Sequence, residues 1–175
     1  MKKILILIVL LHTIVNSDAQ KAIVLDGHFS YLINLKNEHD AEMLKKLQNY
    51  NPQLIDVRYI KTKNKTIVFS ASRYEGAENM PMKIVLEKYV NSVKATPTSK
   101  IIETKTYIKN GKTYYKKVTS AEYIKGTKTI TIMYYFKESD KSEYLYELKI
   151  TADKTTLKEY NRILENIAGT VTFIK

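Results

Sequence analysis

The sequence predicts an α+β protein in which three helices cover a mainly antiparallel sheet of about six to eight strands. Much of the chain alternates apolar and polar residues with the period of a strand, and short turns such as Asn110-Gly111 join these segments into hairpins. Three other stretches repeat apolar residues every three or four positions, as amphipathic helices do. Because hairpins dominate, we expect neighbouring strands to run antiparallel.

The first third of the chain predicts a strand, a helix and a hairpin. Residues 29–35 alternate from Phe29 to Leu35, which is typical of a strand with one buried side. Residues 38–50 predict a helix that ends before Pro52. The apolar stripe of this helix consists of Ala41, Leu44, Leu47 and Tyr50. Residues 54–60 and 66–72 then form a hairpin.

The second helix begins at Pro81, because the fixed φ of proline suits a first helical turn. Thr96-Pro97-Thr98 ends it. Its expected apolar stripe comprises Met82, Val85, Leu86, Tyr89, Val90 and Val93. Four strands follow as a meander, over residues 100–108, 112–124, 127–137 and 142–151.

The third helix has marked ends. Thr156 and Glu159 have the spacing of a capping box, and Gly169 is placed to end the helix in the left-handed conformation. Residues 171–174 predict a final strand. The expected inner stripe of the helix is Leu157, Tyr160, Ile163, Leu164 and Ile167.

The N-terminal segment has the three parts of a secretion signal. Lys2 and Lys3 precede an apolar run over residues 4–15, and small residues at Ser17 and Ala19 suit signal peptidase. The run is too short for a membrane anchor, which needs about 20 apolar residues. A buried N-terminal strand would not need the two lysines. We therefore expect residues 1–19 to be removed and residues 20–175 to form one domain that is exported, soluble, and periplasmic or secreted.

The composition makes the protein basic and free of disulfides. It has no cysteine, which excludes disulfide bridges and a lipoprotein anchor, and its formal net charge is +11. Loss of the signal would leave +10. An anionic surface could therefore be a partner. However, only 3 of the 29 basic residues are Arg, and the abundance of Lys, Ile, Asn and Tyr is typical of an AT-rich coding genome. We favour that explanation, and export makes nucleic acid an unlikely partner.

Three segments and the order of elements resemble a known family. The segments are 27–31 (GHFSY), 67–71 (IVFSA), and 163–167 (ILENI) followed by 171–173 (VTF). They are similar to the PsbP-like family, named for the luminal subunit of photosystem II, whose bacterial relatives are small exported proteins. The resemblance implies an α/β/α sandwich and a non-enzymatic accessory or binding role, with no catalytic or cofactor residues to carry over. The chain departs from the family at Gly169-Thr170-Val171, where a serine is usual, and it lacks a tryptophan after the first strand.

No motif predicts catalysis, a cofactor or a metal centre. Asp26 and His28 could share a strand face, but two ligands are too few for structural zinc, and no third is identifiable. The chain has no Gly-x-Ser-x-Gly, no His-Glu-x-x-His and no phosphate-binding glycine loop. Glu75 and Glu78 are paired carboxylates, but we expect them to lie solvated in a polar loop.

Two groups of residues are weak candidates for a ligand surface. The chain has 14 tyrosines, and Tyr107, Tyr115 and Tyr134 could form an aromatic platform for a sugar or another amphipathic ligand. Cross-strand packing of the tyrosines is the interpretation that we prefer. Lys61, Lys63 and Lys65 cluster at a predicted hairpin turn, where lysines commonly protect a sheet edge.

These observations support three functional hypotheses. The first is an exported non-enzymatic module that contacts an unknown protein or a component of the cell envelope. The second is a carrier of an apolar or glycan ligand between the tyrosine-rich sheet and a helix. A hydrolase without a recognisable motif ranks last. A filled sheet–helix interface favours the first hypothesis, and a deep apolar pocket favours the second.

We expect the exported protein to begin at Gln20, because cleavage after Ala19 places small residues at both positions that signal peptidase reads. The intact mass and the N-terminal sequence of the purified protein measure this directly. A product that retains residues 4–15 would contradict the prediction.

Overall fold

The computed structural model describes residues 23–174, except residues 26, 64, 79, 86, 89–98, 110–111, 125–126 and 154. Several predictions lie outside this part of the chain. They are the signal segment with Ala19 and Gln20, the Asn110-Gly111 turn, and most of the second helix, including Leu86, Tyr89, Val90 and Val93.

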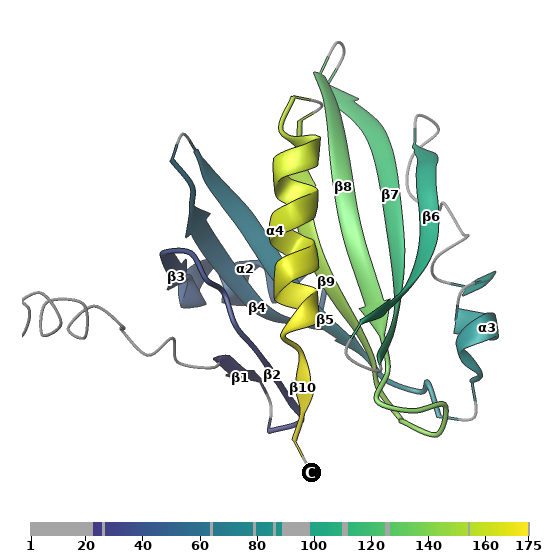
Figure 1. Cartoon of the computed structure of the whole chain (residues 1–175). Helices are drawn as coiled ribbons and strands as arrows, with labels where there is room; N and C mark the ends of the chain where they lie inside the picture. The colour runs from purple at the N-terminus through teal and green to yellow at the C-terminus, as the bar shows by residue number, and fades with distance from the viewer. Residues whose placement is uncertain are drawn as a thin grey trace, which may run out of the picture.

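Most of the described strands form one seven-stranded sheet in the order β3-β4-β5-β9-β8-β7-β6 (Figure 1). All neighbouring pairs run antiparallel, which confirms the mainly antiparallel α+β class. The strands are β3 (Asn37–His39), β4 (Leu54–Lys61), β5 (Thr66–Tyr74), β6 (Lys100–Lys109), β7 (Lys112–Ile124), β8 (Thr127–Phe136) and β9 (Leu145–Ala152).

A second sheet has three short strands in the order β1-β2-β10. They are β1 (Ile23–Leu25), β2 (Phe29–Tyr31) and β10 (Thr172–Phe173). The strand predicted over residues 29–35 is shorter than expected. Beyond Tyr31 the chain leaves the ladder, because Leu32 N donates to the Thr170 hydroxyl oxygen at 2.8 Å. Strands β1 and β3 were not predicted.

Helix α2 (Ala41–Gln48) starts three residues later than predicted, because residues 37–39 pair with β4. The Asp40 carboxylate caps the helix by accepting from Met43 N at 2.8 Å. The predicted inner stripe is not buried: Leu47 is 38% exposed and Tyr50 is 89% exposed. Tyr50 lies past the end of the helix, so the helical period no longer fixes its direction.

Helix α3 (Met82–Val85) begins after Pro81, as predicted, and buries Val85 completely. Helix α4 (Leu157–Gly169) buries Tyr160, Leu164 and Ile167 of its predicted stripe.

Both predicted ends of α4 were wrong in detail. The Thr156 side chain makes no capping bond. Its hydroxyl instead donates to the Asp153 carboxylate at 3.0 Å, which ties the side chain to a residue before the helix rather than to the first helical turn. Gly169 stays helical. Thr170 follows it in the right-handed region, and its hydroxyl donates to the Ile167 carbonyl at 2.7 Å. Because this bond satisfies a carbonyl at the end of the helix, the helix ends without a glycine in the left-handed conformation.

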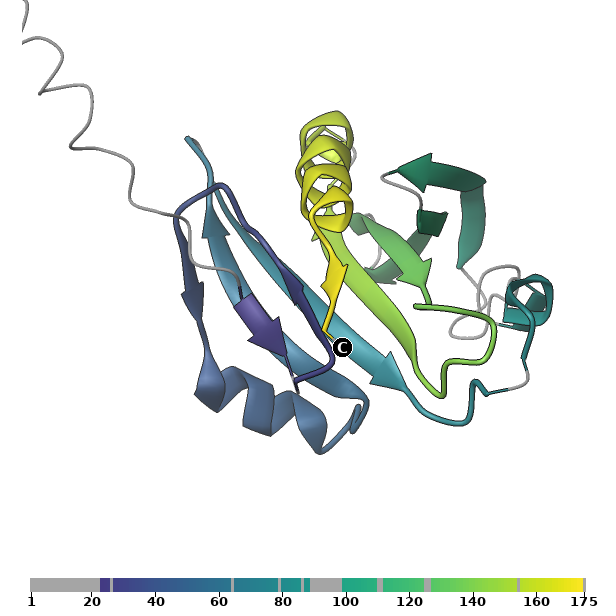
Figure 2. The same cartoon turned by 60° about the horizontal axis from the view of Figure 1, so that its bottom comes forward.

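The helices lie on both faces of the large sheet, but they do not cover both equally. Helix α4 and the small sheet pack on one face, whereas α2 lies on the other, beneath β4 (Figure 2). Val85 of α3 packs with Met133 and Tyr135 of β8 on that second face. Between α2 and α3, no described helix crosses this face, so the predicted α/β/α sandwich is not confirmed. No helix in the described ranges is long and apolar enough to cross a membrane.

The main core lies between the sheet and α4, and aromatic rings fill its centre. Phe29 of the small sheet packs against Tyr146 at a ring-centroid distance of 4.3 Å and against Phe136 at 5.9 Å. Tyr31 packs against Phe69 at 5.4 Å. All five side chains are at most 3% exposed, so burial of these rings holds the small sheet on the large one.

Replacing Leu164 by alanine should lower the free energy of unfolding by about 2–5 kcal/mol, because Leu164 is fully buried and its removal leaves a cavity. Urea unfolding measures the change. Leu47→Ala is the matched control, and we expect it to lower the free energy by less than about 1 kcal/mol. Equal effects would show that α4 does not carry the core.

Candidate contact surface

The most elaborate polar cluster surrounds the Asp56 carboxylate on β4, which is 1% exposed. Arg58 Nε donates to Asp56 Oδ2 at 2.7 Å, and His39 Nδ1 donates to Asp56 Oδ1 at 2.8 Å. The Tyr31 hydroxyl also donates to Asp56 Oδ2. Arg58 Nη1 extends the cluster to Asn37 Oδ1 at 3.1 Å. Burial, with the Asp56 charge beside it, raises the pKa of Tyr31 well above its usual range, so this hydroxyl remains a donor.

This arrangement stabilises structure rather than presenting a reactive group. Three donors from β2, β3 and β4 already engage both oxygens of Asp56. The other strongly buried carboxylate among the described residues is Glu147 on β9. It accepts from the Tyr74 hydroxyl at 3.4 Å and lies on the opposite face of the sheet from Asp56. The two carboxylates therefore do not converge on one cleft.

The structure gives no support to a metal site at the start of β2. His28 is exposed, and its ring packs against Tyr144 at a centroid distance of 5.0 Å. Asp26 lies outside the described residues. Within the described ranges, no group of three or more His, Asp or Glu side chains could hold a metal ion.

The three tyrosines proposed as a platform do not share a face. Tyr107 and Tyr134 pack together on the α4 side, with ring centroids 6.0 Å apart. Tyr115 lies on the other side, in the cluster that includes Tyr135 and Val85. Tyr134 is only 1% exposed, and burial raises its pKa well above its usual range. The structure therefore places these residues mainly in packing roles.

The space between α4 and the tyrosine-rich strands is nearly filled. A hollow of about 120 Å³ remains beside Tyr107, Tyr114 and Glu165. Burial raises the pKa of Tyr114 to about 12, so its hydroxyl stays neutral there. A second hollow of about 260 Å³ lies between residues 32–35 and Arg162 on α4. Both are smaller than the usual range for drug-sized ligands, about 300–1,000 Å³.

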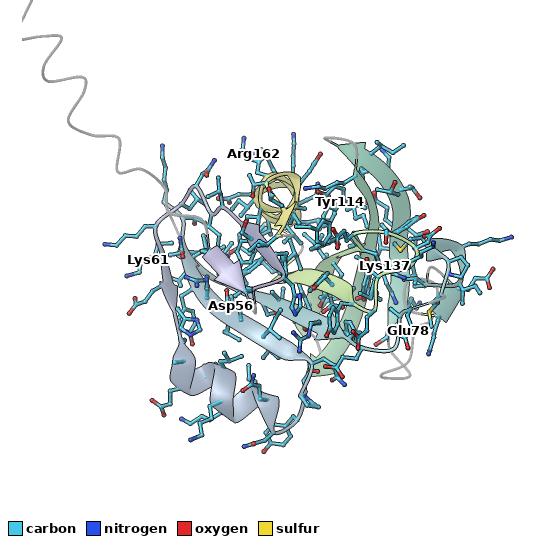
Figure 3. All side chains as sticks on the ribbon, turned by 90° about the horizontal axis from the view of Figure 1, so that it is seen from below. Asp56, Lys61, Glu78, Tyr114, Lys137 and Arg162 are labelled. Atoms are coloured by element: carbon cyan, nitrogen blue, oxygen red, sulfur yellow. The ribbon has the colours of Figure 1, made fainter. Side chains whose placement is uncertain are left out.

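One lysine of the predicted cluster at the β4–β5 turn is paired with an acidic side chain. Lys65 Nζ lies 2.9 Å from Asp153 Oδ2, and bonds from Thr155 and Lys65 hold the pKa of Asp153 well below its usual range. Lys61 and Lys63 are exposed, and their side chains have no acidic partner in the part of the chain described. Figure 3 shows Lys61 at the rim of the molecule and Asp56 inside it. One of the three charges is thus already neutralised.

A different lysine, Lys137, holds a loop to the sheet. It is 7% exposed, and its Nζ donates to the carbonyls of Ala77, Met80 and Asp140 at 2.6, 3.1 and 3.0 Å. Burial lowers the pKa of Lys137. Two of these bonds hold the segment that leads into α3, and the third joins Lys137 to the turn before β9.

The most accessible apolar feature is a notch on the second face, between α2 and strands β4, β5 and β9. It has a volume of about 250 Å³. Tyr50 and Val68, which are 89% and 46% exposed, flank a floor formed by Leu54 and Val57. The residues that line it are Leu47, Tyr50, Asn51, Leu54, Val57, Val68, Ser70, Lys149 and Thr151. We call this feature the α2 notch.

The α2 notch has the properties of a protein contact site. An exposed tyrosine offers a large apolar face, a polar tip and few rotatable bonds, which is why tyrosine is enriched at interfaces. Sequence reasoning missed the notch, because it assigned Leu47 and Tyr50 to a buried stripe. The available signal was Asn51-Pro52, which ends the helix and frees Tyr50 to point outward.

Comparison with solved structures places this fold among known ones. The solution structure of cyanobacterial PsbP (CyanoP) from Synechocystis sp. PCC 6803 has a TM-score of 0.61 at 8% identity, over 91% of this chain and 95% of that one. LpqN from Mycobacterium tuberculosis, described as involved in cell envelope biogenesis, has a TM-score of 0.58 at 11% identity, over 91% and 88%.

A Pseudomonas aeruginosa protein of unknown function, PA94, has a TM-score of 0.50 at 13% identity, over 63% of this chain and 74% of that one. No protein-family model matches the chain, and no curated protein matches it in sequence. At such low identities the comparisons concern the fold alone, and in fold the chain resembles PsbP-like proteins.

Replacing Asp56 by asparagine should lower the free energy of unfolding by about 3–5 kcal/mol, because it leaves the charge of the largely buried Arg58 side chain without its carboxylate partner. Glu42→Gln is the control. It breaks the exposed pair with Lys46 and should lower the free energy by only about 0.3–0.5 kcal/mol. Urea unfolding compares the two, and a change below about 1 kcal/mol at Asp56 would refute a role in holding the sheets together.

Proposed function

We propose that the protein is an exported, non-enzymatic accessory module that acts by contact with a partner protein of the cell envelope. The observation that carries this proposal is the α2 notch, in which Tyr50 is 89% exposed beside an apolar floor. An apolar side chain that protrudes from the partner would enter the notch, and Tyr50 would cover it. Export rests on the signal-like N-terminal segment of the sequence.

The interior supports contact in preference to transport or catalysis. The hollows beside α4 are small for a carried ligand. The buried carboxylates Asp56 and Glu147 face opposite sides of the sheet, so they cannot act on one substrate as an acid–base pair. LpqN, which shares the fold, is described as involved in cell envelope biogenesis, and a role at the envelope fits this neighbour.

The test compares binding by the purified exported protein and by two matched variants. A notch variant, Leu47→Ser with Tyr50→Ser, removes the two apolar side chains at the rim. A control variant, Ile84→Ser with Ile174→Ser, removes apolar side chains that are 47% and 40% exposed elsewhere. We expect cross-linking in an envelope extract to capture one partner with the wild type and the control. The affinity of that purified partner for the notch variant should fall by about tenfold or more.

Equal affinity for the notch and control variants would overturn the proposed surface. Stoichiometric lipid or glycan in the purified protein, identified by mass spectrometry, would overturn the contact role in favour of a carrier. Thermal unfolding of each variant ensures that a loss of binding reflects the surface rather than the fold.

A further inference from the structure

The large sheet ends at one side in a long edge strand. Strand β6 pairs with β7 along one side, and no described strand pairs with its other side. With ten residues, β6 is much longer than the three-residue β3 at the opposite edge (Figure 1). An unpaired edge presents backbone N–H and C=O groups that can take up another strand.

The side chains of β6 differ between its two faces. The register with β7 places Lys100 and Lys105 on the face that packs with α4, together with Tyr107. Ile108 lies on the other face and is 78% exposed. Ile102, beside an irregularity in the pairing, is 51% exposed. The edge therefore offers positive charge on one face and apolar surface on the other.

Most charged residues around β6 are positive. Residues 100–128 contain eight lysines and two glutamates. Glu103 is already paired with Lys116, whose Nζ lies 2.9 Å from its Oε2. Lys100 and Lys105 have no acidic partner among the described residues, and Lys105 Nζ lies 5.0 Å from the centroid of the Tyr107 ring. A strand that pairs with β6 would therefore bind more tightly if it carried acidic side chains on the face of the sheet against which α4 packs.

The lysines at the two ends of β6 disfavour pairing between two copies of this chain. When two β6 strands pair antiparallel about their centre, residue 100 of one copy stands opposite residue 109 of the other, and both are lysines. Like charges directly opposite each other destabilise such a pair. These lysines therefore disfavour self-association, but they attract a partner strand of opposite charge.

We propose that β6 binds an extended acidic segment of a partner protein as an eighth strand of the large sheet. The segment would alternate acidic residues, which face Lys100 and Lys105, with apolar residues, which lie beside Ile108. This inference rests on the proposed contact role and adds a second surface, distinct from the α2 notch.

The experiment uses the purified exported protein and a blocked peptide of alternating valine and glutamate, long enough to span β6. We expect binding by isothermal calorimetry, and protection of alternate β6 amides from hydrogen exchange. The variant Lys100→Glu with Lys105→Glu should bind about tenfold more weakly or worse. The control Lys36→Glu with Lys158→Glu, which changes the net charge equally at exposed sites outside residues 100–128, should bind as the wild type does.

A second peptide separates strand addition from simple charge attraction. It carries N-methyl groups along one edge, which block backbone pairing but keep the charge and the side chains. Equal affinity for both peptides, equal loss of affinity in both charge variants, or dimerisation of the protein through β6 would each overturn the proposal. All variants retain the α2 notch, so failure here is distinguishable from failure of the contact role itself.

Discussion

The fold depends on one buried carboxylate that joins two sheets. Asp56 accepts from Tyr31 of the small sheet, and from His39 and Arg58 of the large one. An unpaired charge in this interior would be costly, so the three donors must be in place together. This requirement fixes the position of β2 over β4, and the aromatic side chains between the two sheets then pack in one arrangement. The polar cluster determines how the small sheet is positioned on the large sheet, and burial of the aromatic rings stabilises that arrangement.

Local patterns in the sequence predicted most of the elements. The meander from β6 to β9 and the buried stripe of α4 follow from periodicity and turn chemistry, which depend on residues close together in the chain. Strands β1 and β3 could not be predicted in this way, because three residues carry no measurable period and pair only through distant partners. The predicted N-terminal cap of α4 was wrong because the Thr156 side chain bonds to Asp153 instead of to the first helical turn, and sequence spacing does not show this alternative partner.

The candidate surfaces were harder to predict than the core. The alternation of Tyr134 and Tyr135 correctly suggested packing on both faces of the sheet. Asn51-Pro52 signals the end of α2 only to within a few residues, so the sequence did not decide whether Tyr50 belongs to the helical period. The exposed edge of β6 depends on strand order, which no local pattern encodes. Lysine content signalled positive charge, but only the structure distinguishes Lys65, paired with Asp153, from Lys100, which has no acidic partner among the described residues.

The small sheet cannot be completed during synthesis until the last strand, β10, has been made. Its central strand, β2, needs β10, which lies far later in the sequence, and α4 comes just before β10. At synthesis rates of about 5–20 residues per second, the nascent chain keeps β2 without one neighbour for on the order of ten seconds. During that interval its aromatic residues have no complete core to enter. A topology whose small sheet closes only with the last strand therefore completes its aromatic core at the very end of synthesis.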